Sequence, residues 1–346
     1  MKVATPYPFP EELAVGFLKD LDEVLVLEEL DPVIEKELLR IVGKYHLSVN
    51  IRGKLTRETR IAGENSVESV KADLAKFLGQ VEVSESNSQT SEEVPPLPVR
   101  PPVLCAGCPH RASFYAVKQA AKGRKAVFSG DIGCYTLGNA KPLDMVDTCL
   151  CMGADVTIAQ GLHIIEPDAL NFAFIGDSTF FASGMTGIVN AVYNQTDIIL
   201  IVLDNSTTAM TGHQPHPGTG VTMMGDVVAK VNIEKILEAV GVSKIAKANP
   251  LNLAEAKAAV ESVMDEKGVR VVIFKSPCIA VSRPEKKYQV EETTCVGCKQ
   301  CIRELGCPAI VIEDGKVKIE SSLCFGCGIC SQVCKFQSIK EVASHE

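Results

Sequence analysis

Residues 170–179 read LNFAFIGDST and residues 198–207 read IILIVLDNST, and these two stretches decide the fold. Each is a run of mostly apolar residues that ends at an aspartate. Runs that are apolar on both faces indicate buried strands of a parallel sheet. Because a helical pattern separates the two runs, a single crossover places both strand ends side by side. Asp177 and Asn205 are therefore expected at the same edge of one sheet.

The flanking sequence extends this pattern over residues 104–282. Short apolar runs alternate with helical spacing, which is typical of a parallel sheet with helices on both faces and predicts the α/β class. Strands are expected at residues 126–129, 170–175, 198–203 and 269–275, and helices at residues 109–122, 154–165, 182–194, 233–240 and 253–267. Neither G-x-G-x-x-G nor G-x-x-x-x-G-K-[ST] occurs there, so a Rossmann dinucleotide site or a P-loop has no motif support.

The polar residues at the expected sheet edge suggest a site for a metal and a phosphate group. Open α/β sheets bind ligands beyond the carboxyl ends of their strands. Asp177 and Asn205 offer the hard oxygens that Mg²⁺ prefers. Gly176 permits close approach of a diphosphate, and a helix beginning near Ala182 can direct its positive end there. Ordinary turns fit this pattern equally well, but the GDIGC and SPC motifs are expected at the same edge and favour a site.

Eight of the 14 cysteines lie between residues 295 and 334 and form two C-x-x-C-x-x-C triplets, each followed by a remote fourth cysteine. Zinc sites normally take cysteines in pairs. Triplets are the two-cluster ferredoxin pattern, in which each fourth cysteine binds the other cluster. One [4Fe–4S] cluster is therefore assigned to Cys295, Cys298, Cys301 and Cys334, and a second to Cys324, Cys327, Cys330 and Cys307. Zinc or free thiols are the alternatives.

Composition divides the remaining chain into three further parts. Residues 1–80 are expected to form a small α/β unit, with a helix at residues 31–42 that has Asp31 as N-cap and Pro32 in its first turn. Residues 81–103 are rich in Ser, Glu and Pro, which indicates an extended linker. Residues 283–346 hold the cysteine triplets and are expected to form an α+β module.

The charge balance and apolar patterning exclude several classes of function. The 346 residues carry 35 Lys and Arg against 43 Asp and Glu, a net charge of −8, which argues against nucleic-acid binding. The longest aliphatic run, residues 198–203, is too short to span a membrane. The N-terminal MKVATPYPFPEEL has no apolar signal core, so a cytoplasmic location with reduced cysteines is expected.

Five segments, taken together and in order, resemble the 2-oxoacid:ferredoxin oxidoreductase family. They are CAGCPHR at residues 105–111, GDIGC at 130–134, CMGA at 151–154, FIGDSTFFASG at 174–184 and LDNSTTAMTG at 203–212. The resemblance covers nearly the whole chain and points to the large (alpha) subunits of the indolepyruvate enzymes in this family. Residues 177–205 resemble the thiamine diphosphate motif, with Ser178 in place of its usual second glycine.

The resemblance implies a thiamine-diphosphate-binding domain at residues 104–282, a transketolase C-terminal-like unit at 1–80 and a terminal ferredoxin-like module. It implies that Asp177, Asn205 and the backbone of Thr207 bind Mg²⁺ and so the diphosphate. The other cofactor-binding residues that it implies are Ile132, Gly133, Cys134, Met152, Gly153, Gly176, Ser178, Met210 and Thr211. His213 and His216 could touch substrate or be exposed loop residues, and His110 could be a simple first-turn residue.

In relatives of this family, four cysteines in the order of Cys105, Cys108, Cys134 and Cys278 bind a cluster beside the thiamine. A third [4Fe–4S] cluster is therefore expected, with zinc or buried thiols as alternatives. Cys149 and Cys151 are interpreted as core or cofactor-lining thiols.

The function that the resemblance implies is ferredoxin-dependent oxidative decarboxylation of an aryl pyruvate such as indolepyruvate. Coenzyme A would take the acyl group, and an external ferredoxin would take the electrons. The alternatives are pyruvate or another 2-oxoacid as substrate, or a non-catalytic electron-transfer subunit. In this family the activating glutamate lies on a pyrimidine-binding domain upstream of the segment that begins this chain. We therefore expect that a partner chain supplies it, alongside a beta- or gamma-type subunit, or that the chain is a fragment.

Overall fold

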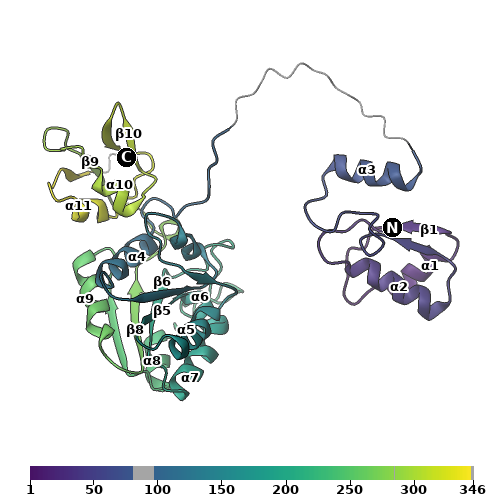
Figure 1. Cartoon of the computed structure of the whole chain (residues 1–346), viewed down its shortest axis with the longest axis horizontal. Coiled ribbons are helices and arrows are strands. Elements are labelled where there is room, and N and C mark those ends of the chain that lie inside the picture. The colour runs from purple at the N-terminus through teal and green to yellow at the C-terminus, as the bar shows by residue number, and fades with distance from the viewer. Residues whose placement is uncertain (81–96, 284, 344–346) are drawn as a thin grey trace. The chain divides into compact units, whose positions relative to one another are not determined.

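The computed structural model describes residues 1–80, 97–283 and 285–343. The chain separates into two compact units, Met1–Pro98 and Val99–Glu346, each described here by itself (Figure 1). Most of the expected linker, residues 81–103, lies outside the described residues. Within the described ranges, no helix is long and apolar enough to cross a membrane.

The first unit is a small α/β fold. Its elements are α1 (Glu11–Leu18), β1 (Glu23–Leu25), α2 (Val33–Tyr45), β2 (Asn50–Arg52) and α3 (Val67–Phe77). β1 and β2 pair in parallel, with Val24 opposite Ile51. A parallel pair needs a crossover, which α2 provides. The core joins Leu18 of α1 and Ile41 of α2 to Val26 and Ile51.

Helix α2 begins differently from the expectation. Its N-cap residue is Pro32, and no side-chain cap bond is made there. The carboxylate of Glu28 accepts hydrogen bonds from the N–H groups of Ile34 (2.8 Å) and Glu35 (3.0 Å) instead. A carboxylate in this place satisfies free N–H groups and complements the helix dipole. The prediction of Asp31 as N-cap is therefore wrong.

The second unit is built on a six-stranded sheet in the order β4-β3-β5-β6-β8-β7, in which all strands are parallel. The strands are β3 (Ala126–Gly130), β4 (Thr148–Cys149), β5 (Leu170–Gly176), β6 (Ile198–Asp204), β7 (Lys244–Ala248) and β8 (Val269–Lys275). The α/β class with a parallel sheet is confirmed. The edge strands β4 and β7 were missed, because one has two residues and the other, KIAKA, carries two lysines.

Helices cover both faces of this sheet (Figure 1). They are α4 (Pro109–Ala120) and α9 (Leu253–Met264) on one face, and α5 (Ala154–Ile165), α7 (Met185–Tyr193) and α8 (Ile233–Ala239) on the other. Each strand divides its residues between two cores. In β6, Ile199 and Ile201 pack toward α4 and α9, whereas Ile198 and Leu200 pack toward the other layer. This division explains why the strand is apolar at every position.

The segment after β5 becomes helical earlier than expected. α6 (Asp177–Thr179) follows the strand directly, and a π-helical turn, η2 (Phe180–Gly184), joins it to α7. The expected helix start near Ala182 is wrong, since the helix begins at Asp177 itself. The first backbone N–H groups of this helix are thereby brought to the strand end, where the site is expected.

Residues 285–343 form a small α+β module. Its elements are β9 (Lys286–Val290), α10 (Gln300–Leu305), β10 (Ile310–Glu313), β11 (Lys316–Ile319), α11 (Ile329–Val333) and β12 (Ile339–Ala343). β9 pairs with β12 and β10 with β11, both antiparallel. Gly326 and Gly328, inside the second cysteine triplet, have φ angles of +77° and +74°. A side chain would be strained in that conformation, so these tight loops need glycine.

Candidate functional site

A cavity with about 520 Å³ of empty space opens at the carboxyl ends of β3, β5 and β6. The strand order reverses at β3, because β4 lies on one side of it and β5 on the other. Ligands of open α/β sheets bind at such switch points. The lining includes the expected Ile132, Gly133, Cys134, Met152, Gly176, Asp177, Ser178, Asn205, Thr207, Met210 and Thr211, together with His110, Tyr135, Thr179, Thr208 and Ala209. Gly153 is not among the lining residues.

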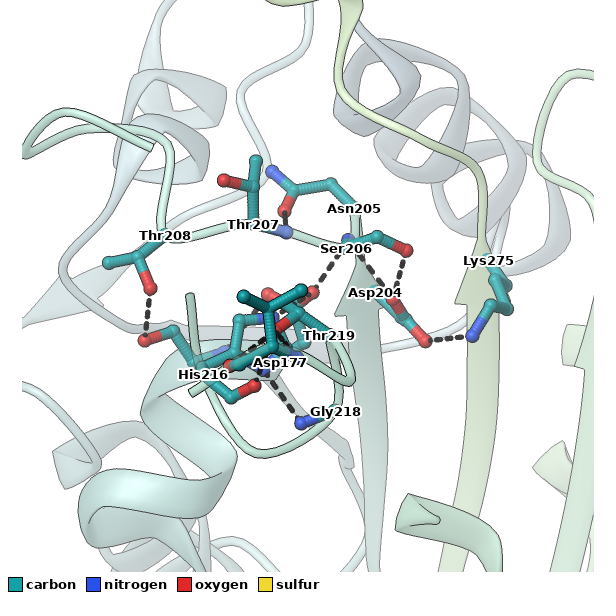
Figure 2. A network of polar contacts seen from close by, with 12 residues as sticks. Asp177, Asp204, Asn205, Ser206, Thr207, Thr208, His216, Gly218, Thr219 and Lys275 are labelled. Atoms are coloured by element: carbon teal, nitrogen blue, oxygen red, sulfur yellow. Dashed lines mark hydrogen bonds and ion pairs between the residues drawn. The ribbon is translucent and has the colours of Figure 1, made fainter. Parts of the chain in front are cut away.

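The carboxylate of Asp177 lies in the cavity and has three hydrogen-bond partners (Figure 2). Its Oδ1 accepts the N–H of Ser178 at 2.9 Å, and its Oδ2 accepts the N–H of Ser206 at 2.7 Å. His216 Nε2 lies 3.1 Å from Oδ2, while its Nδ1 accepts the N–H of Gly218 at 3.2 Å. The ring proton is therefore on Nε2, which donates to Asp177. Burial raises the pKa of the Asp177 carboxyl, and the His216 hydrogen bond opposes that rise.

Asn205 borders the cavity at the end of the neighbouring strand. Its Oδ1 accepts the N–H of Thr207 at 3.2 Å, and its Nδ2 lies 3.2 Å from Nε2 of His110. Burial lowers the pKa of His110 to about 4, so the ring is neutral and Nε2 can accept the amide hydrogen. Ser206 has a φ of +62°, and in this left-handed conformation its N–H reaches Asp177. Backbone strain of this kind concentrates at functional sites.

These residues fit a magnesium–diphosphate headgroup. The Asp177 carboxylate, Asn205 Oδ1 and the main chain of Thr207 are oxygen donors at adjoining strand ends, and Mg²⁺ takes such oxygens together with those of phosphates. A buried carboxylate with a raised pKa is also stabilised by a nearby cation. In the described part of the chain, no three His, Cys, Asp or Glu side chains are arranged to hold one metal ion. The donor set at Asp177 is of a different kind, because it includes an amide and main-chain oxygens.

Tyr135 occupies the space that two glycines leave open. A Cβ on Gly176 or Gly133 would lie within 2.6 Å of the Tyr135 ring. The close approach that we expected between Gly176 and a diphosphate is thus made by this ring. The Tyr135 hydroxyl donates to Asp131 at 2.7 Å and lies 3.2 Å from Oγ1 of Thr179. This network fixes the floor of the cavity.

Two buried carboxylates behind this floor were not predicted from the sequence. Asp131 is fully buried, and its Oδ1 accepts the N–H groups of Ile132 (2.7 Å) and Gly153 (3.0 Å). Gly153 therefore belongs to the wall that supports the cavity. Asp155 on α5 is also fully buried, and burial together with the Asp131 charge raises its pKa well above the usual range. The sequence feature that points to Asp131 is its place in the GDIGC motif, and the motif by itself gives this side chain no role.

The loop histidines and the isolated cysteines are also placed by the structure. His216 is buried and bonded to Asp177, whereas His213 is exposed and does not line the cavity. The exposed-loop interpretation is wrong for His216. Cys149 and Cys151 are exposed, so their interpretation as core thiols is wrong. They are not among the residues that line the cavity, and contact with a cofactor stays a prediction. His110 is more than a first-turn residue, because it is buried against Asn205.

The eight cysteines of the C-terminal module gather around two cavities. Cys295, Cys298, Cys301 and Cys334 (the outer cysteine set) line one of them, and Cys307, Cys324, Cys327 and Cys330 (the inner cysteine set) line the other. These groups are the two sets that the spacing predicts, including the exchange of the fourth cysteine. Burial, and then neighbouring thiolates, raise the pKa of Cys327 to about 11. Four cysteines around one cavity are the ligand set that a [4Fe–4S] cluster takes, which differs from the set that holds a single metal ion.

Cys105, Cys108, Cys134 and Cys278 also approach one another. Burial, then Cys278 and Cys105, raise the pKa of Cys134. Burial raises the pKa of Cys108 to about 12, and Cys105 adds to that rise. The N–H of Cys278 donates to the carbonyl of Asn205 at 2.9 Å, which ties this group to the cavity. Cys134 belongs to both places, because it also lines the cavity.

Comparison with known proteins agrees with this geometry. Residues 131–274 match the family model of the thiamine pyrophosphate enzyme C-terminal TPP binding domain. The matched range begins where β3 ends and includes β5, β6 and the loops that border the cavity. This part of the chain is therefore similar to the C-terminal TPP binding domain of thiamine pyrophosphate enzymes.

Over nearly its whole length, the chain is a homologue of proteins named indolepyruvate oxidoreductase subunit IorA, which confirms the family resemblance drawn from the motifs. It is 39% identical over 347 residues to that of Methanothermobacter thermautotrophicus, covering 98% of this chain and 55% of the relative. It is 38% identical over 377 residues to that of Pyrococcus horikoshii, covering 100% and 57%. The chain thus spans little more than half the length of these relatives. A solved 2-oxoglutarate:ferredoxin oxidoreductase from Magnetococcus marinus covers 54% of this chain and 67% of its own, with 19% identity and a TM-score of 0.46.

Proposed function

We propose that this chain binds thiamine diphosphate with Mg²⁺ and three [4Fe–4S] clusters, as part of an enzyme that oxidatively decarboxylates aryl pyruvates with ferredoxin as acceptor. The products would be an aryl-acyl coenzyme A and carbon dioxide. One observation carries the proposal: Cys134 lines the cavity that contains Asp177 and also belongs to the group formed with Cys105 and Cys278. A redox centre held there would lie directly beside the thiamine cofactor.

In this proposal each polar residue of the cavity has a task. Asp177, Asn205 and the Thr207 main chain would hold Mg²⁺, and bound thiamine diphosphate would supply the nucleophilic carbon and the electron sink for decarboxylation. His110 accepts the Asn205 amide hydrogen and so keeps Oδ1 of that amide, with its second lone pair, available to the metal. His216 orients the Asp177 carboxylate through its Nε2–H. These tasks are positional, and none of them moves a proton on substrate.

The mouth of the cavity supports the proposal of a partner. Ile132, Met152 and Met210 border it, yet 38%, 46% and 54% of their surfaces are exposed. Apolar side chains exposed around a cofactor cavity suit a second protein surface that closes it. Among the described residues, no glutamate lines the cavity. We therefore propose that a pyrimidine-binding domain elsewhere supplies the activating glutamate, with a beta- or gamma-type subunit and an external ferredoxin as further partners.

The proposed substrate is an aryl pyruvate. Indolepyruvate rests on the names of the relatives, and Tyr135 and His110 are the rings among the described residues that line the cavity. Pyruvate or another aliphatic 2-oxoacid is the rival substrate. A panel of aryl and aliphatic 2-oxoacids, assayed with the assembled complex and a ferredoxin, decides between them. Preference for pyruvate over indolepyruvate contradicts the aryl assignment.

The cofactors are tested on the full chain after anaerobic reconstitution. We expect calorimetry to detect thiamine diphosphate binding that requires Mg²⁺, and analysis to find about twelve iron and twelve labile sulfide per chain. About eight of each means that Cys105, Cys108, Cys134 and Cys278 hold no cluster. Chains that hold iron but bind no thiamine diphosphate favour the rival class, a non-catalytic electron-transfer subunit. Rapid 2-oxoacid oxidation by the chain alone contradicts the proposed partner.

A further inference from the structure

Arg111 is a buried cation held between two cysteine loops. It lies on α4 and is 3% exposed. Its Nη2 donates to the carbonyl of Leu104 at 2.6 Å, and its Nη1 donates to the carbonyls of Leu305 (2.5 Å) and Gly306 (3.0 Å). Leu104 directly precedes Cys105, and Gly306 directly precedes Cys307. One guanidinium therefore connects two cysteine loops. One is the loop at Cys105, in the domain of residues 104–282 (the thiamine domain), and the other is the loop at Cys307 of the inner cysteine set.

The same two loops are in direct contact. A Cβ on Gly107 would lie 2.4 Å from Cβ of Phe325, so the C-x-x-C loop at 105–108 packs against the loop of the second triplet. Ala106 and Gly107 also line the cavity of the inner cysteine set. The cavity of the outer cysteine set is lined, among the described residues, by residues of the C-terminal module alone. The inner set is thus the one that faces the thiamine domain.

The positive charge of Arg111 should influence the inner cysteine set more strongly than the outer cysteine set. Its three hydrogen bonds go to neutral carbonyls, which stabilise the guanidinium without cancelling its charge. Two of these carbonyls, those of Leu305 and Gly306, belong to the residues just before Cys307 of the inner set. Among the described residues, the cavity of the outer set is lined by neither Arg111 nor any of the three residues whose carbonyls it bonds. A buried charge is screened little by solvent, so its influence is strong but local.

We propose that Arg111 raises the reduction potential of a cluster held by the inner cysteine set above that of a cluster held by the outer set. Dithionite reduces a [4Fe–4S] cluster by one electron, which adds one negative charge to the cluster. A fixed positive charge beside the inner cluster stabilises that added electron, whereas the outer cluster lies away from it. Electrons arriving from the thiamine domain would therefore rest first on the inner cluster. This inference depends on the proposed iron–sulfur content of the chain.

The test is a dithionite titration of the reconstituted full chain, followed by electron paramagnetic resonance at controlled potential. Arg111→Gln removes the charge and keeps a hydrogen-bonding side chain, while Arg111→Lys keeps the charge. We expect Arg111→Gln to reduce the equilibrium preference of the electron for the inner cluster about tenfold, equivalent to about 59 mV for a one-electron couple. Arg111→Lys should retain most of the gap between the two potentials. Lys299 is exposed and lines the cavity of the outer cysteine set. Lys299→Gln should therefore shift the potential of the outer cluster slightly, which shows which of the two measured potentials belongs to that cluster.

An Arg111→Gln chain that keeps its iron and its gap in potential overturns the inference. If Arg111→Gln does not fold, Arg111→Lys decides. Loss of the difference between the two reduction potentials in Arg111→Lys, where the charge is still present, would show that the hydrogen bonds matter and the charge does not. A wild-type chain that holds fewer than about eight iron atoms contradicts the proposed function instead. The two failures are therefore distinguishable.

Discussion

The cavity at Asp177 and the cysteine module are two proposed cofactor sites of opposite design. The cavity lies on a six-stranded sheet with an apolar core on each face, and its polar groups are hydrogen-bonded to one another. The module has two two-stranded sheets and helices of six and five residues, and several of its cysteines belong to its small core. A domain this small seldom buries enough apolar surface to fold alone.

The difference concerns what each cofactor contributes. In the sheet domain the fold positions the ligands, so the cofactor adds affinity and chemistry to a site that exists already. In the module the cluster is expected to take the place of the missing core, since metal binding and folding are coupled in such domains. Four predictions test this contrast, from the largest expected effect to the smallest.

Removal of iron should have the largest effect, because it should unfold the module while the sheet domain stays folded. After anaerobic chelation, hydrogen exchange should show loss of protection at β9 to β12, α10 and α11. Protection at β5 and β6 should persist, since their cores contain no cysteine of the module. A module that keeps its protection without iron would show that its apolar contacts suffice.

Asp177→Asn should weaken thiamine diphosphate binding in the presence of Mg²⁺ by about 100-fold, because it removes the carboxylate charge at the proposed metal site. The measurement is calorimetry on the reconstituted chain. Asp197→Asn is the matched control, since Asp197 lies just before β6, at the opposite edge of the sheet, and is paired with Lys267. Equal losses in the two variants would contradict the assignment of Asp177.

His216→Ala should weaken the same binding about tenfold, because it removes a donor that orients the Asp177 carboxylate. His213→Ala, three residues away on the exposed part of the loop, should leave it unchanged. Thermal unfolding of both variants shows whether any loss comes from a disordered loop. If the two variants bind equally well, the His216 contact has no role in orienting the carboxylate.

Asp155→Asn should have the smallest effect, a gain in stability of the order of 1 kcal/mol at pH 7. Burial raises the pKa of Asp155 in the folded state above its unfolded value. The Asp155 carboxyl therefore contributes fully to stability at a pH below its pKa in the unfolded chain. This contribution is lost as the pH rises through its pKa in the folded protein. The asparagine variant cannot ionise, so it should lack this loss.

Denaturant unfolding at several pH values measures the effect, with Asp168→Asn, an exposed acid after the same helix, as control. A variant at Asp155 that is less stable than wild type at pH 7 would mean that the ionised carboxylate is stabilised in the fold.

Local sequence was sufficient for the features that depend on spacing along one segment. The strands β5 and β6 were predictable because each is a mostly apolar run, and the placement of Asp177 and Asn205 on one cavity followed from the geometry of parallel strands. The grouping of the module's cysteines followed from the triplet spacing. In each case a few neighbouring residues contain all the information that the geometry requires.

Features that depend on side chains meeting across the fold were not predictable. The Tyr135 ring beside Gly176 and Gly133 is one example, and the carboxylate of Glu28 in the place of Asp31 at the start of α2 is another. His216 was ambiguous for the same reason, because nothing in HQPHP distinguishes a buried histidine from an exposed one. Each of these contacts is selected by competition among many nearby polar groups, which local patterns do not describe.

By itself, the sequence determined a parallel α/β domain, the strand ends that carry Asp177 and Asn205, and two sets of four cysteines. Only the tertiary structure decided that His216 holds Asp177, that Asp131 supports Gly153, and that Arg111 lies between two cysteine loops. The physical reason is the range of the interactions. Hydrophobic periodicity and ligand spacing act within one segment, whereas a buried hydrogen bond between distant residues exists only after packing has excluded water and brought the partners together.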